Sequence, residues 1–401
     1  MLEQLKKEYL DRMKLDLKDD FEKYLNSFND EEKHGLIINM KKLSKSDLSL
    51  DEFLKLFNLD ILYKDRNLVY ATYDKNLLEK DKIYIGKHPL HHAGLYYVQE
   101  PSAAKPVVEF GVEEDDAVLD LCASPGGKTI ETLCNLGKNG FIISNEIDFT
   151  RAKVLISNIE RLGFDNAIVS CCNSKTFLTY FTSFFDKIIV DAPCSGEGMM
   201  RKSLEARRQW SKELVIKMAH IQKELLDNAY LMLKNGGKIL YSTCTFSMEE
   251  DEDNVQYLLN KYNDLTLEKS EKIYPHLSIG EGQFYAIFKK DGEEKSRSKI
   301  PNNDIISKIN ILKYGFEKYE KKHNVVVPTH MSTHIDYVSF DNVIELNYED
   351  IIKYIHGDTI PVPENYENGF YKVTYRKLGI GLGKIVKGVL KNHYPKGLRN
   401  I

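Results

Sequence analysis

The stretch that decides the fold is residues 117–129. It reads Ala117-Val118-Leu119-Asp120-Leu121-Cys122-Ala123-Ser124-Pro125-Gly126-Gly127-Lys128-Thr129. Its apolar beginning predicts a buried strand, the glycine pair predicts a turn, and a helix is expected from about 128 to 136. A strand that passes through a glycine turn into a helix is typical of an open α/β sheet. In such sheets, ligands bind in a crevice at the carboxyl ends of the strands.

Two more apolar runs lead into short cysteine motifs. Residues 187–190 precede Asp191-Ala192-Pro193-Cys194-Ser195-Gly196, and residues 238–241 precede Ser242-Thr243-Cys244-Thr245. We expect the thiols of Cys194 and Cys244 to face one crevice beside Asp191, because parallel strands end at the same edge of a sheet. Two thiols and an acid favour covalent chemistry. Either cysteine taken alone is equally consistent with a small buried core residue.

Strands and helices alternate over the middle of the chain, which predicts a doubly wound α/β sheet. A long amphipathic helix is expected to end at Asn235-Gly236-Gly237, and Ser247-Met248-Glu249-Glu250 has the form of a capping box that opens a helix. The remaining expected elements are strands at 141–144, 167–170 and 283–288, and a helix at 149–162 that ends at Gly163.

The flanking regions suggest smaller domains. Residues 1–87 are predicted to form an N-terminal accessory domain, with helix starts at Asp30-Glu31-Glu32-Lys33 and Ser49-Leu50-Asp51-Glu52. The main domain is placed at 88–290, and a polar linker follows at 291–300. Residues 301–401 mix short apolar runs with Gly and Pro, which is typical of a small α+β or β-barrel module.

Composition excludes several classes of protein. The chain has 401 residues, of which 42% are hydrophobic and 29% charged, and a net charge of −4. No run of 18 apolar residues predicts a membrane span, and the N-terminus lacks the apolar stretch of a signal peptide. All six cysteines lie between positions 122 and 244 without a Cys-x-x-Cys pair, which favours a reduced, cytoplasmic protein without structural zinc. The three histidines at 88, 91 and 92 are interpreted as structural or RNA-facing rather than as metal ligands, and the single Trp, Trp210, as a core residue.

The glycine turn predicts a nucleoside site. A phosphate-binding P-loop is excluded because Cys122 stands where that motif requires glycine. Glu146 follows the second strand about twenty residues later, where such an acid accepts the hydroxyls of a ribose. A nucleoside without a required pyrophosphate fits S-adenosyl-L-methionine. A structural turn and a surface glutamate are an equally good account of these residues alone.

Together these motifs resemble the RNA cytosine-5 methyltransferases of the NOL1/NOP2/Sun family. The matching segments are 119–129, 191–196 and 241–245, with Tyr97-Val98-Gln99-Glu100-Pro101-Ser102 as the family's entry segment. The resemblance covers about 88–290. Within the family, residues 388–399 resemble the bacterial F-type 16S ribosomal RNA enzymes, which implies a C-terminal PUA-like RNA-binding module.

The resemblance implies a Rossmann-like class I methyltransferase sheet between an N-terminal α+β segment and the PUA-like module. It implies that Cys244 is the nucleophile, that Cys194 assists release of the product, and that Asp191 is the partner of cytosine N3. The family usually has an acid where this chain has Asn173. The implied contacts of S-adenosyl-L-methionine are Cys122, Ala123, Ser124, Pro125, Gly126, Gly127, Lys128, Glu146, Asn173 and Asp191.

Basic residues suggest where RNA binds. Arg201 and Lys202 follow the Cys194 motif, where they are expected to meet phosphates or to form a solvated helix face. The last thirty residues contain eight Lys or Arg and no acid, which favours a polyanion-docking surface over a merely solvated tail. The candidate RNA-binding residues there are Lys391, His393, Lys396 and Arg399.

We therefore expect a cytoplasmic, monomeric enzyme that methylates cytosine C5 in 16S ribosomal RNA, free or within the 30S subunit, with no metal and no membrane partner. Two alternatives stay open: a transfer RNA methyltransferase of the same family, and a non-catalytic ribosome-assembly factor. DNA methylation is disfavoured, because those enzymes use the thiol of the Pro-Cys motif as nucleophile and do not need Cys244.

Overall fold

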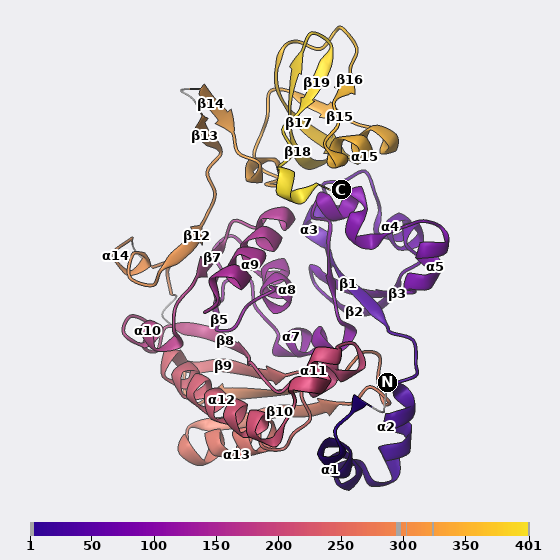
Figure 1. The fold of residues 1–401 in the computed structure, drawn as a ribbon. Coiled ribbons are helices and arrows are strands. Elements are labelled where there is room, and N and C mark those ends of the chain that lie inside the picture. Colours follow the sequence, from indigo (N-terminus) through magenta and orange to yellow (C-terminus); the bar gives the residue numbers. More distant parts are fainter. Residues whose placement is uncertain (1–3, 294–297, 302, 323–324, 400–401) are drawn as a thin grey trace. The chain divides into compact units, whose positions relative to one another are not determined.

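The protein was analysed as a computed structural model that describes residues 4–293, 298–301, 303–322 and 325–399. Within it the chain forms two compact units (Figure 1). The first unit consists of residues 1–34, 99–152 and 168–312, and the second of residues 35–98, 153–167 and 313–401. Each unit is thus assembled from three separate stretches of chain. Residues 294–297 of the predicted linker lie outside the described residues.

An eight-stranded sheet organises the first unit. The strands run in the order β10-β11-β9-β8-β5-β6-β7-β12. Strand β5 pairs in parallel with β6 on one side and with β8 on the other, and β8 pairs in parallel with β9. The order reverses at β5, which confirms the predicted doubly wound sheet and places a ligand crevice at this switch point. The strands are β5 (Ala117–Asp120), β6 (Phe141–Asn145), β7 (Ala167–Ser170), β8 (Phe185–Asp191), β9 (Leu233–Thr243), β10 (Leu265–Ile273), β11 (Gln283–Lys290) and β12 (Ile311–Tyr314).

Helices between the strands cover the sheet. Helix α12 packs on β8 and β9, α13 on β10, and α8 on β6, as the ribbon shows (Figure 1). Buried apolar side chains of the strands and helices form one core, including Leu119, Ile188, Leu226 and Phe284. The helices of this unit are α7 (Lys105–Phe110), α8 (Gly127–Asn135), α10 (Ser174–Leu178), α11 (Leu204–Gln209), α12 (Lys212–Met232), α13 (Glu252–Lys261) and α14 (Asn303–Ile306). Helix α9 (Phe149–Leu162) begins in this unit, and its residues from 153 on belong to the second.

The first thirty residues belong to this unit as well. Helices α1 (Lys7–Leu17) and α2 (Phe21–Ser27) bury Tyr9 and Tyr24 in a cluster with Trp210 and Phe246. The core position predicted for Trp210 is confirmed, since only 1% of its surface is exposed. The N-terminal helices therefore pack on the segments that follow the two cysteine motifs.

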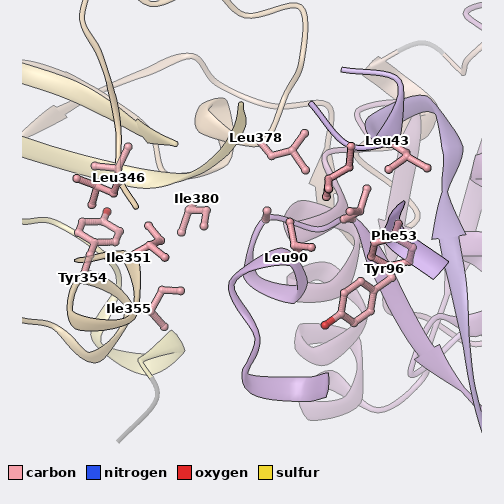
Figure 2. Close-up of a cluster of buried hydrophobic side chains, with 14 of the residues drawn as sticks. Leu43, Phe53, Leu90, Tyr96, Leu346, Ile351, Tyr354, Ile355, Leu378 and Ile380 are labelled. Carbon is pink, nitrogen blue, oxygen red and sulfur yellow. The ribbon is translucent and has the colours of Figure 1, made fainter. Parts of the chain in front are cut away.

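The second unit joins parts of the chain that are far apart in sequence. A four-stranded sheet has the order β2-β3-β1-β4, and a five-stranded sheet has the order β15-β17-β18-β19-β16. One buried cluster contains Phe53 and Tyr96 from the first segment and Ile351 and Tyr354 from the last (Figure 2). These residues share one core because each sheet leaves an apolar face that the other segment covers.

The helices of this unit are α3 (Met40–Leu43), α4 (Leu50–Leu56), α5 (Lys75–Lys80), α6 (Pro89–His92) and α15 (Tyr348–His356). Its strands are β1 (His34–Asn39), β2 (Asp60–Asp65), β3 (Leu68–Tyr73), β4 (Tyr96–Gln99), β13 (Tyr319–Lys322), β14 (Val325–Pro328), β15 (Val343–Glu345), β16 (Ile360–Pro361), β17 (Gly369–Tyr375), β18 (Leu378–Val386) and β19 (Val389–Asn392).

Helix boundaries show where local signals are sufficient and where they fail. The capping box at Ser49 is confirmed, because its side chain accepts from the Glu52 N–H and Glu52 reaches back to the Ser49 N–H. The helix start predicted at Asp30–Lys33 is wrong, since the buried strand β1 begins at His34 instead. The predicted end of the long helix at Asn235–Gly237 is also wrong. Helix α12 ends at Met232, and the chain enters β9 directly because pairing with β8 takes over.

The box predicted at Ser247–Glu250 does not open a helix, and α13 begins at Glu252. Ser247 Oγ does donate to Glu250 Oε1, at 2.9 Å. The other oxygen of Glu250 accepts from the backbone N–H of Ser195 and from Gln222 Nε2. The Glu250 carboxylate thus accepts hydrogen bonds from residues distant in sequence instead of from the Ser247 N–H, which it would bind in a capping box.

Candidate active site

A cavity of about 510 Å³ opens at the carboxyl ends of β5, β6, β8 and β9. The strand ends place polar and thiol side chains around it, as expected at the switch point of a doubly wound sheet. Eight of the predicted site residues line the cavity, whereas Ala123, Pro125, Gly126 and Gly127 are not among its lining residues. The eight are Cys122, Ser124, Lys128, Glu146, Asn173, Asp191, Cys194 and Cys244.

The two predicted catalytic thiols meet in this cavity. Cys194 Sγ and Cys244 Sγ are 3.2 Å apart, although fifty residues separate them in sequence. Their loops are tied together, because the Gly198 N–H donates to the Cys244 carbonyl at 2.9 Å. The hydrogen bond with Cys244, reinforced by burial, holds the pKa of Cys194 well above its usual value. Cys194 is therefore a protonated thiol at neutral pH.

Asp191 lies at the end of β8 with both carboxylate oxygens engaged. Oδ1 accepts from Ser242 Oγ at 2.7 Å, and Oδ2 is 2.9 Å from Lys128 Nζ. Burial alone lowers the pKa of Lys128, but the charge of Asp191 and the hydrogen bond to it raise that pKa overall. The buried lysine is thus a permanent cation that fixes the Asp191 carboxylate at the cavity wall.

The glycine turn has the conformation that its sequence requires. Gly126 has φ +116°, which a residue with a side chain rarely adopts, and α8 begins directly after it. Beneath the turn, the buried Asp120 accepts a hydrogen bond from Thr129 Oγ1 at 2.7 Å. Burial raises the pKa of Asp120 to about 7. Thr129 anchors the first turn of α8 to the end of β5 in this way.

Glu146 and Asn173, from the segments that follow β6 and β7, also line the cavity. The Glu146 side chain is nearly buried, its Oε1 accepts from the Asp148 N–H at 2.9 Å, and its Oε2 is 3.4 Å from Arg151 Nη1. Asn173 Oδ1 accepts from the Lys175 N–H at 2.9 Å and so caps α10. The Asn173 side-chain oxygen, which was expected to contact the cofactor, thus accepts a hydrogen bond from the first turn of α10. This helix cap was not predicted from the sequence.

The predicted RNA-binding residues lie in different environments. Arg201 is buried, with Nε 3.5 Å from a carboxylate oxygen of Glu281, and Lys202 Nζ is 3.5 Å from the other oxygen. Their contact with RNA phosphates stays a prediction. In the second unit, Lys391, His393 and Lys396 are exposed. Arg399 is half-buried and donates to the Tyr394 carbonyl, and it also stays a prediction.

Two functional candidates were not expected from the sequence. Glu250 binds the backbone of the Cys194 loop, and Glu197, three residues after Cys194, binds the backbone of the Cys244 loop, as described below. The only local signal of Glu197 is an acid between two glycines, three residues after Cys194. Among the described residues, no group of three or more His, Cys, Asp or Glu side chains is arranged to hold a metal ion. No helix in the described part of the chain is long and apolar enough to cross a membrane.

Family models match most of the chain. The model of 16S rRNA methyltransferase RsmB/F matches residues 108–301. The N-terminal domain of 16S rRNA methyltransferase RsmF matches residues 5–101, and the PUA domain of methyltransferase RsmF matches residues 341–400. The three matches follow one another along the chain without overlap, and all three models describe 16S rRNA methyltransferases of the RsmB/F type.

Three curated relatives share one name, ribosomal RNA small subunit methyltransferase F. Ribosomal RNA small subunit methyltransferase F from Vibrio vulnificus is 32% identical over 325 residues, which are 76% of this chain and 66% of that protein. The protein of that name from Aliivibrio fischeri is 35% identical over 53% of this chain and 49% of its own length. The one from Vibrio parahaemolyticus is 29% identical over 80% and 82%. The matches thus span two thirds or less of the first two relatives.

Solved structures share the fold. NSun6 from Pyrococcus horikoshii with SFG has a TM-score of 0.61 at 20% identity and covers 73% of this chain and all of that one. A methyltransferase homolog protein from Pyrococcus horikoshii has a TM-score of 0.55 at 23% identity, over 71% of this chain and all of that one. These neighbours confirm the predicted class I methyltransferase sheet, and the family model confirms the C-terminal PUA-like module. The chain belongs to the family of 16S rRNA methyltransferases RsmB/F.

Proposed function

We propose that this protein transfers a methyl group from S-adenosyl-L-methionine to C5 of a cytosine in 16S ribosomal RNA, through a covalent adduct with Cys244. The observation that carries the proposal is the pair of thiols 3.2 Å apart in a cavity that also contains the Asp191–Lys128 ion pair. Simple binding of a nucleoside needs no such thiol pair. The family membership supports ribosomal RNA as the substrate.

Cytosine C5 is a weak nucleophile, and the chain's residues are suited to overcome this. Addition of the Cys244 thiolate to C6 forms an S–C6 bond and makes C5 electron-rich. During this addition N3 takes up a proton from solvent, and the carboxylate of Asp191, held by Lys128 and Ser242, accepts the hydrogen bond of the resulting N3–H. Because the protonated thiol of Cys194 lies against Cys244, it is placed to donate to the departing Cys244 sulfur when the S–C6 bond breaks, while the C5 proton passes to water.

The cavity also fits the methyl donor. When bound, S-adenosyl-L-methionine supplies an electrophilic methyl group to C5. Glu146 would hold its ribose hydroxyls, since a nearly buried carboxylate is a strong acceptor for such donors. Asn173 and those residues of the glycine turn that line the cavity, Cys122, Ser124 and Lys128, would hold the rest of the cofactor. The family name supports a methyl donor in this cavity.

The experiment is methyl transfer from labelled S-adenosyl-L-methionine to unmodified 30S subunits, naked 16S RNA and bulk transfer RNA, with nucleoside analysis of the products. We expect 5-methylcytidine in the ribosomal samples. Label only in transfer RNA would keep the chemistry and overturn the substrate. Label in no RNA, together with no thermal stabilisation by S-adenosyl-L-methionine, would overturn the proposal in favour of a non-catalytic assembly factor.

A further inference from the structure

Glu197 is a buried carboxylate at the centre of the two cysteine loops. It lies in the short 3₁₀ helix Glu197–Arg201, and only 1% of its surface is exposed. A buried carboxylate is costly unless each oxygen is paired. Oε1 accepts from Trp210 Nε1 at 2.7 Å and from Arg12 Nη2, and Oε2 accepts from the Phe246 N–H at 3.0 Å. Both oxygens are thus satisfied by three different segments.

These contacts bridge the two thiols. Glu197 is three residues after Cys194, and Phe246 is two residues after Cys244, so one carboxylate joins the loop of each thiol. The contact acts together with the bond from the Gly198 N–H to the Cys244 carbonyl. Two short links on the same side of the loops limit how far the sulfurs move apart.

The N-terminal helix supplies the charge that makes this bridge stable. Arg12 of α1 forms an ion pair with Glu197, and its guanidinium lies 5.5 Å from the ring centroids of both Tyr9 and Trp210. Tyr9 packs edge-on against Trp210 at 5.3 Å. The Glu197 side chain is fully buried beside the apolar cluster of α1, α2 and Phe246, whereas the Arg12 side chain is 19% exposed, so the ion pair is partly shielded from water.

We propose that Glu197 and Arg12 are positioning residues, which hold Cys194 against Cys244 at the separation that catalysis needs. Arg12 therefore acts through Glu197 from outside the cavity, since no residue of α1 is among the lining residues. This inference rests on the proposed function for its effect on catalysis. Its structural part, the distance between the sulfurs, is independent of any substrate.

The first test measures methyl transfer by Glu197→Gln and Arg12→Met. Glutamine keeps the shape but offers one acceptor oxygen to three donors, and methionine removes the cation. Because small misplacement of reacting groups slows catalysis strongly, we expect kcat to fall by about tenfold or more while both KM values change less than about twofold. Arg12→Lys, which keeps the charge, should recover part of the loss. Lys14→Met, at an exposed position of the same helix, is the matched control and should behave as wild type.

The second test needs no RNA. Diamide removes two electrons and two protons from a thiol pair and leaves a disulfide, and the reaction requires the sulfurs to approach to about 2 Å. We expect the Cys194–Cys244 disulfide, followed by peptide mass, to form several-fold more slowly in Glu197→Gln and Arg12→Met than in wild type or Lys14→Met.

Variants that melt at lower temperature but keep the wild-type kcat and disulfide rate would overturn the proposal, because the network would then serve stability alone. Wild-type protein without methyl transfer would instead reject the proposed function, and the disulfide rates would still decide this inference. If Glu197→Gln does not fold, Arg12→Met carries the test, since the Arg12 side chain is 19% exposed and its loss disturbs less of the core.

Discussion

Replacing Cys194 by alanine should convert this enzyme into one that traps its RNA. In the proposed reaction Cys244 forms the bond to C6, and Cys194 acts only afterwards, when the adduct breaks down. The sulfur of Cys194 is 3.2 Å from that of Cys244, close enough for its thiol to donate a proton to the Cys244 sulfur as the S–C6 bond breaks. The variant should therefore form the adduct and fail to release it.

The size of the effect follows from what the side chain does. Removing a general acid or base typically slows its step by about 10²- to 10⁴-fold. If formation proceeds at a typical ~10 s⁻¹, release at ~0.1 s⁻¹ or slower leaves roughly 99% of the enzyme as adduct. Cys194 is only partly buried, so the loss of its sulfur should cost about 1 kcal/mol of stability or less, and the variant should fold.

The assay is a denaturing gel with labelled 16S RNA and S-adenosyl-L-methionine, on which the adduct migrates as a slow band that protease removes. Cys244→Ala should give no band, and the double variant should also give none. Cys134→Ala is the matched control, because Cys134 is a buried cysteine of α8 away from the cavity. A band in Cys244→Ala, or normal turnover in Cys194→Ala, would refute the assigned roles.

Three further predictions concern the cofactor, pH and RNA. Glu146→Ala should weaken the binding of S-adenosyl-L-methionine, measured by calorimetry, by about 10- to 100-fold, because the substitution removes a charged hydrogen-bond acceptor. The affinity for RNA should not change. Burial lowers the pKa of His88 and of His330 to about 4, so the unfolded state binds protons that the folded state does not. The stability that these two neutral histidines contribute should therefore be fully present above pH 6.5 and be lost as pH falls towards 4. Over that range each histidine should raise the unfolding constant by about tenfold per pH unit. The raised pKa of Asp120 acts in the opposite direction, so the check compares variants: a urea midpoint that changes equally between pH 7.5 and 5 in His330→Gln and in wild type would contradict the prediction. Charge reversal of exposed Lys391 and Lys396 should weaken RNA binding and lower the salt slope by about one per lost phosphate contact.

Local sequence determined six of the eight strands of the sheet, whereas β10 and β12 were not predicted. Strand β7 and helix α9 have the predicted bounds, because apolar periodicity and a terminal glycine suffice where neighbours do not compete. The strand–turn–helix unit at 117–129 is correct for the same reason, and its ending in a glycine with positive φ is a property of that residue alone. Cysteines at the ends of two strands could be assigned to one crevice, since the rules of parallel sheets depend on chain direction and not on details of packing.

Tertiary contacts decided the rest. The two cysteine loops, whose sulfurs lie 3.2 Å apart, are held by contacts of Glu250 with Ser195 and of Glu197 with Phe246 and Arg12, which join residues 49 to 185 positions apart in the chain. The same demand explains why the capping box at Ser247 failed, since Glu250 binds the backbone of another loop instead. The pairing of residues 35–98 with the C-terminal segment in one core likewise has no local signal. Sequence by itself thus determined which chemical groups arrive at the crevice. Only the folded structure decided their distances, because buried charges and apolar faces select partners by position in space and not along the chain.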